Sequence, residues 1–148
     1  MRLDYLQEKD RDIYLALVNT FGGDGLTDDQ WKTFFDEYEQ SDCRVIYLAR
    51  VMDKTLNQEI VVGTVSFLVE QKAHRQLLNA IHIEDVTIAR AFRGLGLGKQ
   101  MMKLAIEEAK TYNGYKIILE CSDSNGNDTF YEKCGFRKAE IQMRLDIE

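Results

Sequence analysis

Apolar and polar side chains alternate along several segments of the chain, as they do in half-buried β-strands. The clearest alternation covers residues 81–88, where Ile81, Ile83, Val86 and Ile88 are apolar. Comparable patterns, bounded by polar stretches, indicate strands in residues 3–6, 44–52, 59–69, 116–121 and 139–147. Only the polar stretch 53–58 separates the second and third of these, which predicts an antiparallel hairpin. The chain is therefore expected to form a sheet of several strands.

Helical periodicity marks other segments. Thr27 and Gln30 form a capping box, and bulky aromatic residues follow at helical spacing, at Trp31, Phe34, Phe35 and Tyr38. Because burial requires such spacing, we expect this stripe to belong to the core rather than to a substrate pocket. Further helices are expected from Asp10 or Asp12 through Val18, over residues 99–112, and from Asn127 or Asp128 through Cys134.

Composition narrows the class of protein. The 148 residues are 45% hydrophobic, contain no proline and divide into no linker-separated parts, so a single domain over residues 1–148 is expected. A net charge of −6 argues against a nucleic-acid partner, whose phosphates need a basic surface. No apolar run reaches membrane-spanning length, and the start of the chain lacks a signal-peptide core. A soluble, cytoplasmic protein without a membrane partner is expected, and import into a microbody stays open.

The three cysteines, Cys43, Cys121 and Cys134, predict neither a disulfide framework nor a metal site. Their number is odd, and their spacing does not match that of zinc ligands. Reduced, buried thiols and no bound metal are expected.

The chain is organised around a strand, a glycine-rich turn and a helix. The turn runs from Arg93 to Lys99 and contains glycine at every second position from Gly94. Such a turn exposes backbone N–H groups at a helix N-terminus, where an anion, usually a phosphate, is favoured. A P-loop is excluded because Arg93 stands where it needs a glycine and Gln100 where it needs Ser or Thr. A dinucleotide fingerprint is excluded because Lys99 stands at its third glycine.

The remaining pattern, with Arg93, Gly96 and Gly98 as its anchors, resembles the pyrophosphate-binding arm of the GCN5-related N-acetyltransferases. Together with His82 to Asp85, residues 115–121 and residues 130–136, it is similar to the glucosamine-6-phosphate N-acetyltransferase family. The resemblance implies an α/β fold: a mixed, mostly antiparallel central sheet, splayed at the cofactor site and flanked by helices. It also implies acetyl transfer from acetyl-CoA to the amine of D-glucosamine 6-phosphate, without a metal, by a homodimer whose C-terminal strands help to build the partner's site.

The resemblance assigns the catalytic roles to Glu84, Asp85 and Tyr131. A carboxylate takes the proton of the amine, directly or through water, and the Tyr131 phenol serves the departing thiolate. Successive strand residues face opposite ways, so Glu84 and Asp85 reach one site only if a bulge interrupts the strand. The alternatives are that the carboxylates are ordinary surface charges and that Tyr131 is a packed aromatic residue.

The remaining ligand contacts are also implied by the resemblance. Acetyl-CoA is expected against the backbone of Val86, Thr87 and Ile88, the turn of Arg93, Gly94, Leu95, Gly96, Leu97, Gly98 and Lys99, and the side chains of Asn127, Tyr131 and Lys133. The sugar phosphate is expected near Thr20, Lys72, His74, Glu84, Asp85, Tyr115, Glu120 and Arg144. Solvent exposure is an alternative for Lys133 and for the charged segment around Lys72 and His74, and an edge-strand position for Tyr115.

Two features depart from the family pattern. The loop after Cys121 is two residues longer than usual, and Asp146 stands where the family tends to have a basic residue, with Arg144 on the same strand face. Two alternative functions therefore stay open. The chain is either an acetyltransferase for another amine, such as a polyamine or a protein N-terminus, or a non-catalytic acyl-CoA-binding sensor.

Overall fold

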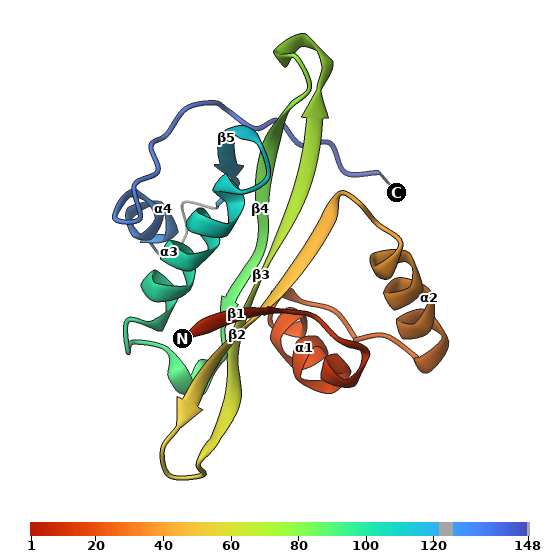
Figure 1. The fold of residues 1–148 in the computed structure, drawn as a ribbon, viewed down its shortest axis with the longest axis vertical. Helices are drawn as coiled ribbons and strands as arrows, with labels where there is room; N and C mark the ends of the chain where they lie inside the picture. Colours follow the sequence, from red (N-terminus) through yellow and green to blue (C-terminus); the bar gives the residue numbers. More distant parts are fainter. Residues whose placement is uncertain (122–125, 148) are drawn as a thin grey trace.

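A computed structural model of the chain describes residues 1–121 and 126–147. It contains one five-stranded sheet in the order β1-β2-β3-β4-β5 (Figure 1). The strands are β1 (Arg2–Tyr5), β2 (Arg44–Asp53), β3 (Gln58–Lys72), β4 (Leu78–Ile88) and β5 (Gly114–Leu119). The first three pairings are antiparallel and β4 runs parallel to β5, which confirms the expected mixed sheet.

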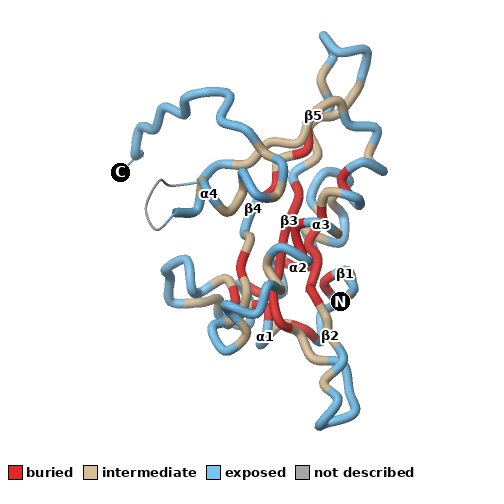
Figure 2. Tube along the Cα trace, turned by 90° about the vertical axis from the view of Figure 1, so that its left-hand side faces the viewer, coloured by how far each residue is buried: buried red, intermediate tan, exposed pale blue. Residues whose placement is uncertain are grey.

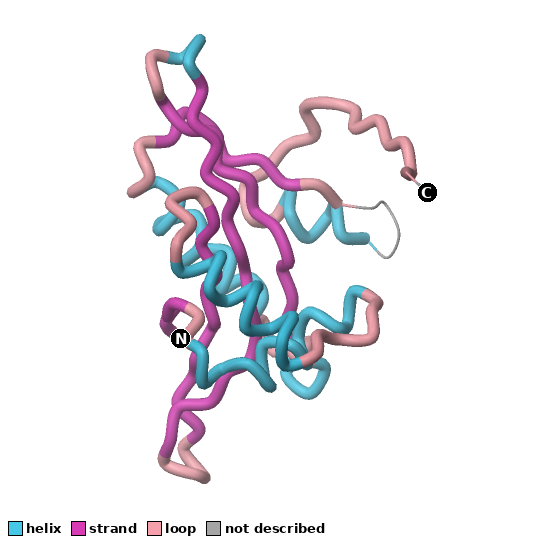
Figure 3. Tube along the Cα trace, turned by 90° about the vertical axis from the view of Figure 1, so that its right-hand side faces the viewer, coloured by secondary structure: helices cyan, strands magenta, loops and turns pink. Residues whose placement is uncertain are grey.

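Helices cover both faces of the sheet (Figures 1 and 3). They are α1 (Arg11–Val18), α2 (Asp28–Glu39), α3 (Leu97–Lys110) and α4 (Asn127–Glu132). The first two lie on one face, and α3 with α4 lies on the other. Since β4 and β5 are parallel, α3 forms the crossover between them. No described helix is long and apolar enough to cross a membrane.

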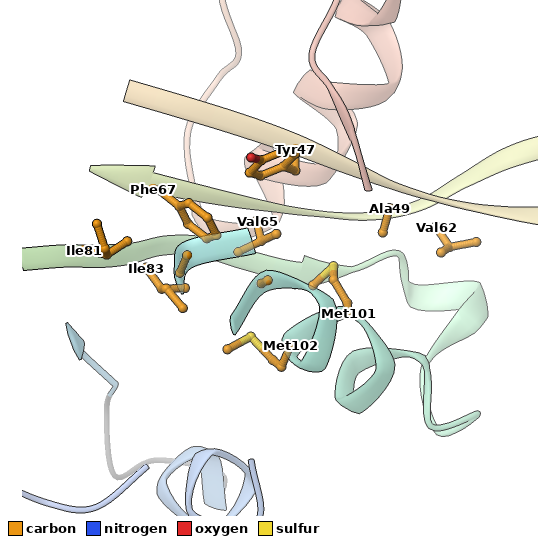
Figure 4. Packing of buried hydrophobic residues seen from close by; sticks show 11 residues of the cluster. Tyr47, Ala49, Val62, Val65, Phe67, Ile81, Ile83, Met101 and Met102 are labelled. Carbon is orange, nitrogen blue, oxygen red and sulfur yellow. The ribbon is translucent and has the colours of Figure 1, made fainter. Parts of the chain in front are cut away.

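Each face of the sheet has its own core, because successive strand residues point to opposite sides. On the α3 face, Met101 and Met102 pack with strand residues such as Val65, Phe67 and Ile81 (Figure 4). On the opposite face, Ile46 and Leu48 of β2 pack against Tyr14, Leu17, Trp31 and Phe35 of the first two helices. The aromatic stripe of α2 is therefore core, as expected.

The helix starts agree only partly with the sequence signals. Thr27 and Gln30 form the predicted capping box, with reciprocal bonds of 3.3 and 2.9 Å. Asp10 occupies the N-cap of α1, but its carboxylate binds the guanidinium of Arg50 at 2.8 Å. The prediction for α4 was wrong by one residue, since Gly126 is its N-cap. Asp128 lies inside α4, where its carboxylate accepts bonds from Thr129 and Lys138.

The predicted last strand over residues 139–147 is wrong, since the described residues 137–147 have no regular structure. The apolar side chains of the segment alternate as in a strand, yet Ile141, Met143, Leu145 and Ile147 are about nine-tenths exposed. Figure 2 shows the tail extending away from the buried centre of the molecule. A strand needs a neighbour for its backbone hydrogen bonds, and the single chain offers this segment none.

The expectation that the three cysteines are buried is wrong for two of them. Cys43 and Cys121 are exposed and only Cys134 is half-buried, because Cys43 precedes β2 and Cys121 follows β5 in connecting segments. The predicted loop 122–126 lies outside the described residues except for Gly126. Within the described part of the chain, no cluster of three His, Cys, Asp or Glu side chains is arranged to hold a metal.

Candidate active site

A bulge interrupts β4 next to the two acidic residues singled out in the sequence. Thr64 of β3 faces Thr87, but Ser66 faces Glu84, so Asp85 and Val86 together oppose a single residue of β3. Asp85 adopts the left-handed backbone region with φ of 49°. This extra residue confirms the expected bulge, and it lets two successive carboxylates face the same side.

Beyond the bulge, no described strand pairs with the other edge of β4, because β5 pairs with it only as far as Ile83 and Leu119. The Ala89 N–H donates to the Val62 carbonyl, so ladder alternation directs the Thr87 N–H toward β3 and the Ile88 N–H away from it. The Ile88 carbonyl also faces away from β3 and accepts a 2.9 Å bond from Arg93 Nε. The sheet is therefore splayed here, with backbone groups of β4 directed into a gap.

A cavity of about 350 Å³, here called the strand-gap cavity, lies beside this gap. Its lining consists of Phe21, Ile83, Glu84, Asp85, Val86, Glu120, Cys121, Asn127 and Tyr131. The charged side chains of this lining are all acidic. The Glu84 side chain opens to solvent at the cavity, yet partial burial raises the pKa of its carboxyl, and the nearby charges of Asp85 and Glu120 raise it further.

Tyr131 reaches the strand-gap cavity from α4. Its ring packs edge-on against Phe130 and Phe136, with centroid distances of 5.1 and 6.1 Å. Burial raises the pKa of the Tyr131 phenol. The phenol therefore keeps its proton throughout the neutral pH range and is suited to donating it.

A second cavity of about 540 Å³, here called the α3 cavity, runs along α3 from its N-terminus as far as Glu107. It is lined by Gly96, Lys99, Gln100, Lys103, Ile106, Glu107, Lys133 and Cys134. Gly96 is the N-cap of α3 with φ of 76°, and no side chain caps the first N–H groups of the helix. A Cβ at Gly94 or Gly96 would meet nothing within 4 Å, so the turn leaves room against its backbone.

These features fit the diphosphate arm of a coenzyme A thioester. An uncapped N-terminus of a 14-residue helix offers donors to an anion, and three lysines lie along the adjoining cavity. The splayed β4 edge leads from this helix toward the carboxylates. The residues present can thus hold a long, phosphate-bearing thioester with its acyl end at the strand-gap cavity.

The structure brings together only part of the expected site. Glu84, Asp85, Val86, Glu120, Asn127 and Tyr131 line the strand-gap cavity, and Gly96, Lys99 and Lys133 line the α3 cavity. Of the residues expected at the sugar phosphate, five line neither cavity: Thr20, Lys72, His74, Tyr115 and Arg144. Of those expected at acetyl-CoA, seven line neither cavity: Thr87, Ile88, Arg93, Gly94, Leu95, Leu97 and Gly98.

The sugar-phosphate residues that line neither cavity make other contacts or lie far from the strand-gap cavity, and His74 lies in the turn Ala73–Arg75, just beyond Lys72. Lys72 lies six residues beyond Ser66 along β3, about 20 Å away at strand rise. The Thr20 hydroxyl donates to the Leu17 carbonyl, and Arg144 pairs with Asp146 in the tail. Tyr115 lies under the Arg75 guanidinium at 5.2 Å.

Sequence reasoning missed Ser66 and Lys103, and it assigned no role in the site to Phe21 or Cys121. The Ser66 hydroxyl donates to Asp85 at 3.2 Å, a contact that depends on the β3–β4 register. Lys103 follows Lys99 by one helical turn, so helical spacing alone was a usable signal for it. Phe21 comes from the turn between α1 and α2, next to Thr20 and before a glycine-rich loop, so its position beside an expected substrate residue was a usable signal for it.

Comparison with known proteins agrees with this geometry. The Acetyltransferase (GNAT) family matches residues 11–136. A glucosamine 6-phosphate N-acetyltransferase of Arabidopsis thaliana is 35% identical over 119 residues, which are 80% of this chain and 76% of that protein. One of Schizosaccharomyces pombe is 37% identical over 64% of this chain and 83% of its own.

Solved structures give the same result. The crystal structure of glucosamine-6-phosphate N-acetyltransferase from Arabidopsis thaliana superposes with a TM-score of 0.82 at 31% identity, covering 99% of this chain and 98% of that one. The splayed sheet, the uncapped helix with its glycine turn and the sequence match agree with one another. The chain belongs to the GNAT family of acetyl-CoA-dependent acetyltransferases.

Proposed function

We propose that this enzyme transfers the acetyl group of acetyl-CoA to the amine of D-glucosamine 6-phosphate, giving N-acetyl-D-glucosamine 6-phosphate and CoA, a step toward UDP-N-acetylglucosamine. The observation that carries the proposal is the composition of the strand-gap cavity. Carboxylates from the β4 bulge and the protonated phenol of α4 line this same cavity. The names of the Arabidopsis and Schizosaccharomyces relatives support the choice of acceptor.

Acetyl-CoA supplies the acetyl thioester when bound. The uncapped N–H groups of α3, with the Gly94 to Gly98 turn, hold its diphosphate, and Lys99 and Lys133 neutralise phosphate charge. The outward N–H of Ile88 binds the pantetheine arm. The neighbouring backbone N–H of Val86, at the bulge, stabilises negative charge that develops on the thioester oxygen.

The residues of the strand-gap cavity move the protons. An amine in water near neutral pH is mostly protonated, and Glu84 or Asp85 takes its proton so that the nitrogen lone pair is free. The raised pKa of Glu84 makes this carboxylate a better base than one in water. As the new C–N bond forms and the C–S bond breaks, Tyr131 gives its proton to the departing sulfur. The nitrogen loses its second proton to solvent, and solvent returns a proton to the Tyr131 oxygen.

The strand-gap cavity of a single chain lacks, among its described lining residues, a cation for the phosphate of the sugar. A sugar phosphate needs a cation, and none of the described residues that line this cavity is basic. We therefore extend the proposal to a homodimer in which a partner subunit supplies the phosphate anchor from the segment around Lys72 and His74. The exposed, strand-like side chains of residues 141–147 favour pairing with a second copy.

The same lining favours a second candidate acceptor. Three carboxylates, Glu84, Asp85 and Glu120, attract a cationic amine such as a polyamine without any help from a partner. In either case we propose a cytoplasmic enzyme formed by one domain, acting on small molecules rather than on nucleic acid or membranes.

The deciding experiment measures thiol release from acetyl-CoA with four amines: D-glucosamine 6-phosphate, unphosphorylated glucosamine, spermidine and a short peptide. Strong preference for the phosphorylated sugar supports the proposed acceptor. Preference for spermidine or the peptide would show that the acceptor is a polyamine or a protein N-terminus instead. Tight acetyl-CoA binding without turnover of any amine leaves only the acyl-CoA sensor.

A further inference from the structure

One aromatic side chain at the strand-gap cavity has no role in the chemistry described above. Phe21 lines this cavity, although it comes from the short 3-10 turn after α1, far in sequence from the other lining residues. Its side chain is 54% exposed. It belongs to neither core cluster, and no other ring in the described part of the chain packs against it.

An exposed ring beside a cavity differs from the other aromatic residues nearby. The ring of Trp31 packs against those of Phe34 and Phe35, and Tyr131 packs against Phe130 and Phe136. Exposing an aromatic surface costs free energy that is recovered when a ligand covers it. Phe21 is therefore the aromatic surface of the cavity that is available to a ligand.

The ligand that suits this surface combines charge with a flat apolar face. The carboxylates of Glu84, Asp85 and Glu120 suit an ammonium group, while the Phe21 ring suits a rigid face of C–H groups. A hexopyranose amine has both features in one molecule. An open-chain amine has the ammonium group but presents no fixed face to the ring.

We propose that Phe21 is a specificity-determining residue that packs its ring against the C–H face of a pyranose acceptor and so selects ring-shaped amines over open-chain amines. The assignment rests on the proposed function, since it concerns the acceptor of that same reaction. In this assignment Phe21 recognises the flat apolar face of the acceptor, whereas the carboxylates recognise its positive charge.

The test compares wild type with Phe21→Ala, Phe21→Trp and, as a matched control, Leu56→Ala. Leu56 is an equally exposed apolar residue, in the β2–β3 turn. Thiol release gives the KM for D-glucosamine 6-phosphate and for acetyl-CoA. The inhibition constant of 2-aminoethyl phosphate, which carries the same two charged groups on an open chain, is measured in the same assay.

For Phe21→Ala we expect the KM for D-glucosamine 6-phosphate to rise about tenfold, the size of effect that apolar groups have on discrimination. The inhibition constant of 2-aminoethyl phosphate and the KM for acetyl-CoA should stay within about twofold of the wild-type values. Loss of the apolar contact with Phe21 leaves the contacts between charged groups in place. Phe21→Trp should restore the KM, and Leu56→Ala should match wild type. Thermal melting checks that each variant is folded.

Two results overturn the assignment while leaving the proposed function intact. One is an unchanged KM for the sugar phosphate in Phe21→Ala. The other is an equal weakening of the sugar phosphate and of 2-aminoethyl phosphate, which would indicate that Phe21 only shapes the turn. Absence of turnover of the sugar phosphate by wild type rejects the proposed function itself, and the assignment with it.

Discussion

The hydroxyl of Ser66 donates a hydrogen bond of 3.2 Å to Oδ2 of Asp85, across the point where β4 bulges. Ser66 is buried on β3, whereas Asp85 is exposed to the cavity and adopts a positive φ. The bond thus holds the exposed Asp85 carboxylate against the buried part of β3. It fixes one carboxylate of the strand-gap cavity relative to the other.

Replacing Ser66 by alanine should slow acetyl transfer without unfolding the protein. Loss of the hydroxyl removes a bond of about 1 kcal/mol, which corresponds to about a fivefold lower kcat. The KM for acetyl-CoA should not change. Thr33→Ala, which removes a comparable hydroxyl from the exposed face of α2, serves as control. A kcat equal to wild type would show that Asp85 needs no such support.

Replacing Glu84 by glutamine should stabilise the fold at neutral pH while slowing the reaction. The pKa of Glu84 is raised above its ordinary value of 4.5, so the folded protein binds the proton more tightly than the unfolded chain does. The ionised carboxylate therefore destabilises the fold above its folded-state pKa. The advantage of glutamine should disappear as the pH falls through that pKa to below 4.5.

Urea unfolding of wild type and Glu84→Gln at several pH values measures this difference. Solvent access to the side chain keeps the effect small. The same titration of kcat/KM should show an acid limb above pH 4.5 in wild type that Glu84→Gln loses. A constant stability difference at all pH values would contradict the raised pKa.

Replacing Tyr131 by phenylalanine should reduce kcat by about a hundredfold or more, the usual contribution of a general acid. Affinity for acetyl-CoA, measured by calorimetry, should remain close to wild type because the ring is retained. Tyr38→Phe is the matched control, since Tyr38 also packs against another ring but lies on α2 and lines neither cavity. Equal rates in the two variants would remove Tyr131 from the mechanism.

Alanine at Lys99, Lys103 or Lys133 should weaken acetyl-CoA binding through lost charge. Each lysine lines the α3 cavity, and a unit charge pair near water contributes about 1 kcal/mol, or about a fivefold change in KM. Raising the ionic strength should diminish the difference from wild type. Lys32→Ala changes an exposed lysine of α2, on the other face of the sheet, and should behave as wild type.

Removing residues 137–148 should convert a dimer into a monomer. The exposed Ile141, Met143, Leu145 and Ile147 are the side chains expected to meet a second copy. Light scattering should give twice the 17.2 kDa chain mass for the full protein and one chain mass after truncation. A full-length protein that scatters as a single chain would refute the dimer.

Local signals in the sequence predicted the elements whose stability is local. The Thr27 and Gln30 capping box, the α2 aromatic stripe and the hairpin of β2 and β3 all form where periodicity placed them. The glycine turn before α3 was likewise predictable, because it depends on backbone conformations that glycine permits.

Features that depend on distant parts of the chain escaped prediction. The Ser66 and Asp85 contact follows from strand register, and the position of Phe21 follows from how α1 packs on the sheet. The strand over residues 139–147 failed for the opposite reason. Its alternation was real, but pairing requires a neighbouring strand that the single chain does not provide.

The strand-gap cavity takes its lining from residue 21 through residue 131, and so from nearly the whole chain. Contacts between residues so distant in sequence form late in folding, after local hairpins and helices. The ability to bind the acceptor should therefore arise in the last folding step, and a growing chain on the ribosome should lack activity until α4 has emerged and docked. Selection for rapid maturation would act on the docking of α4 rather than on the formation of the sheet.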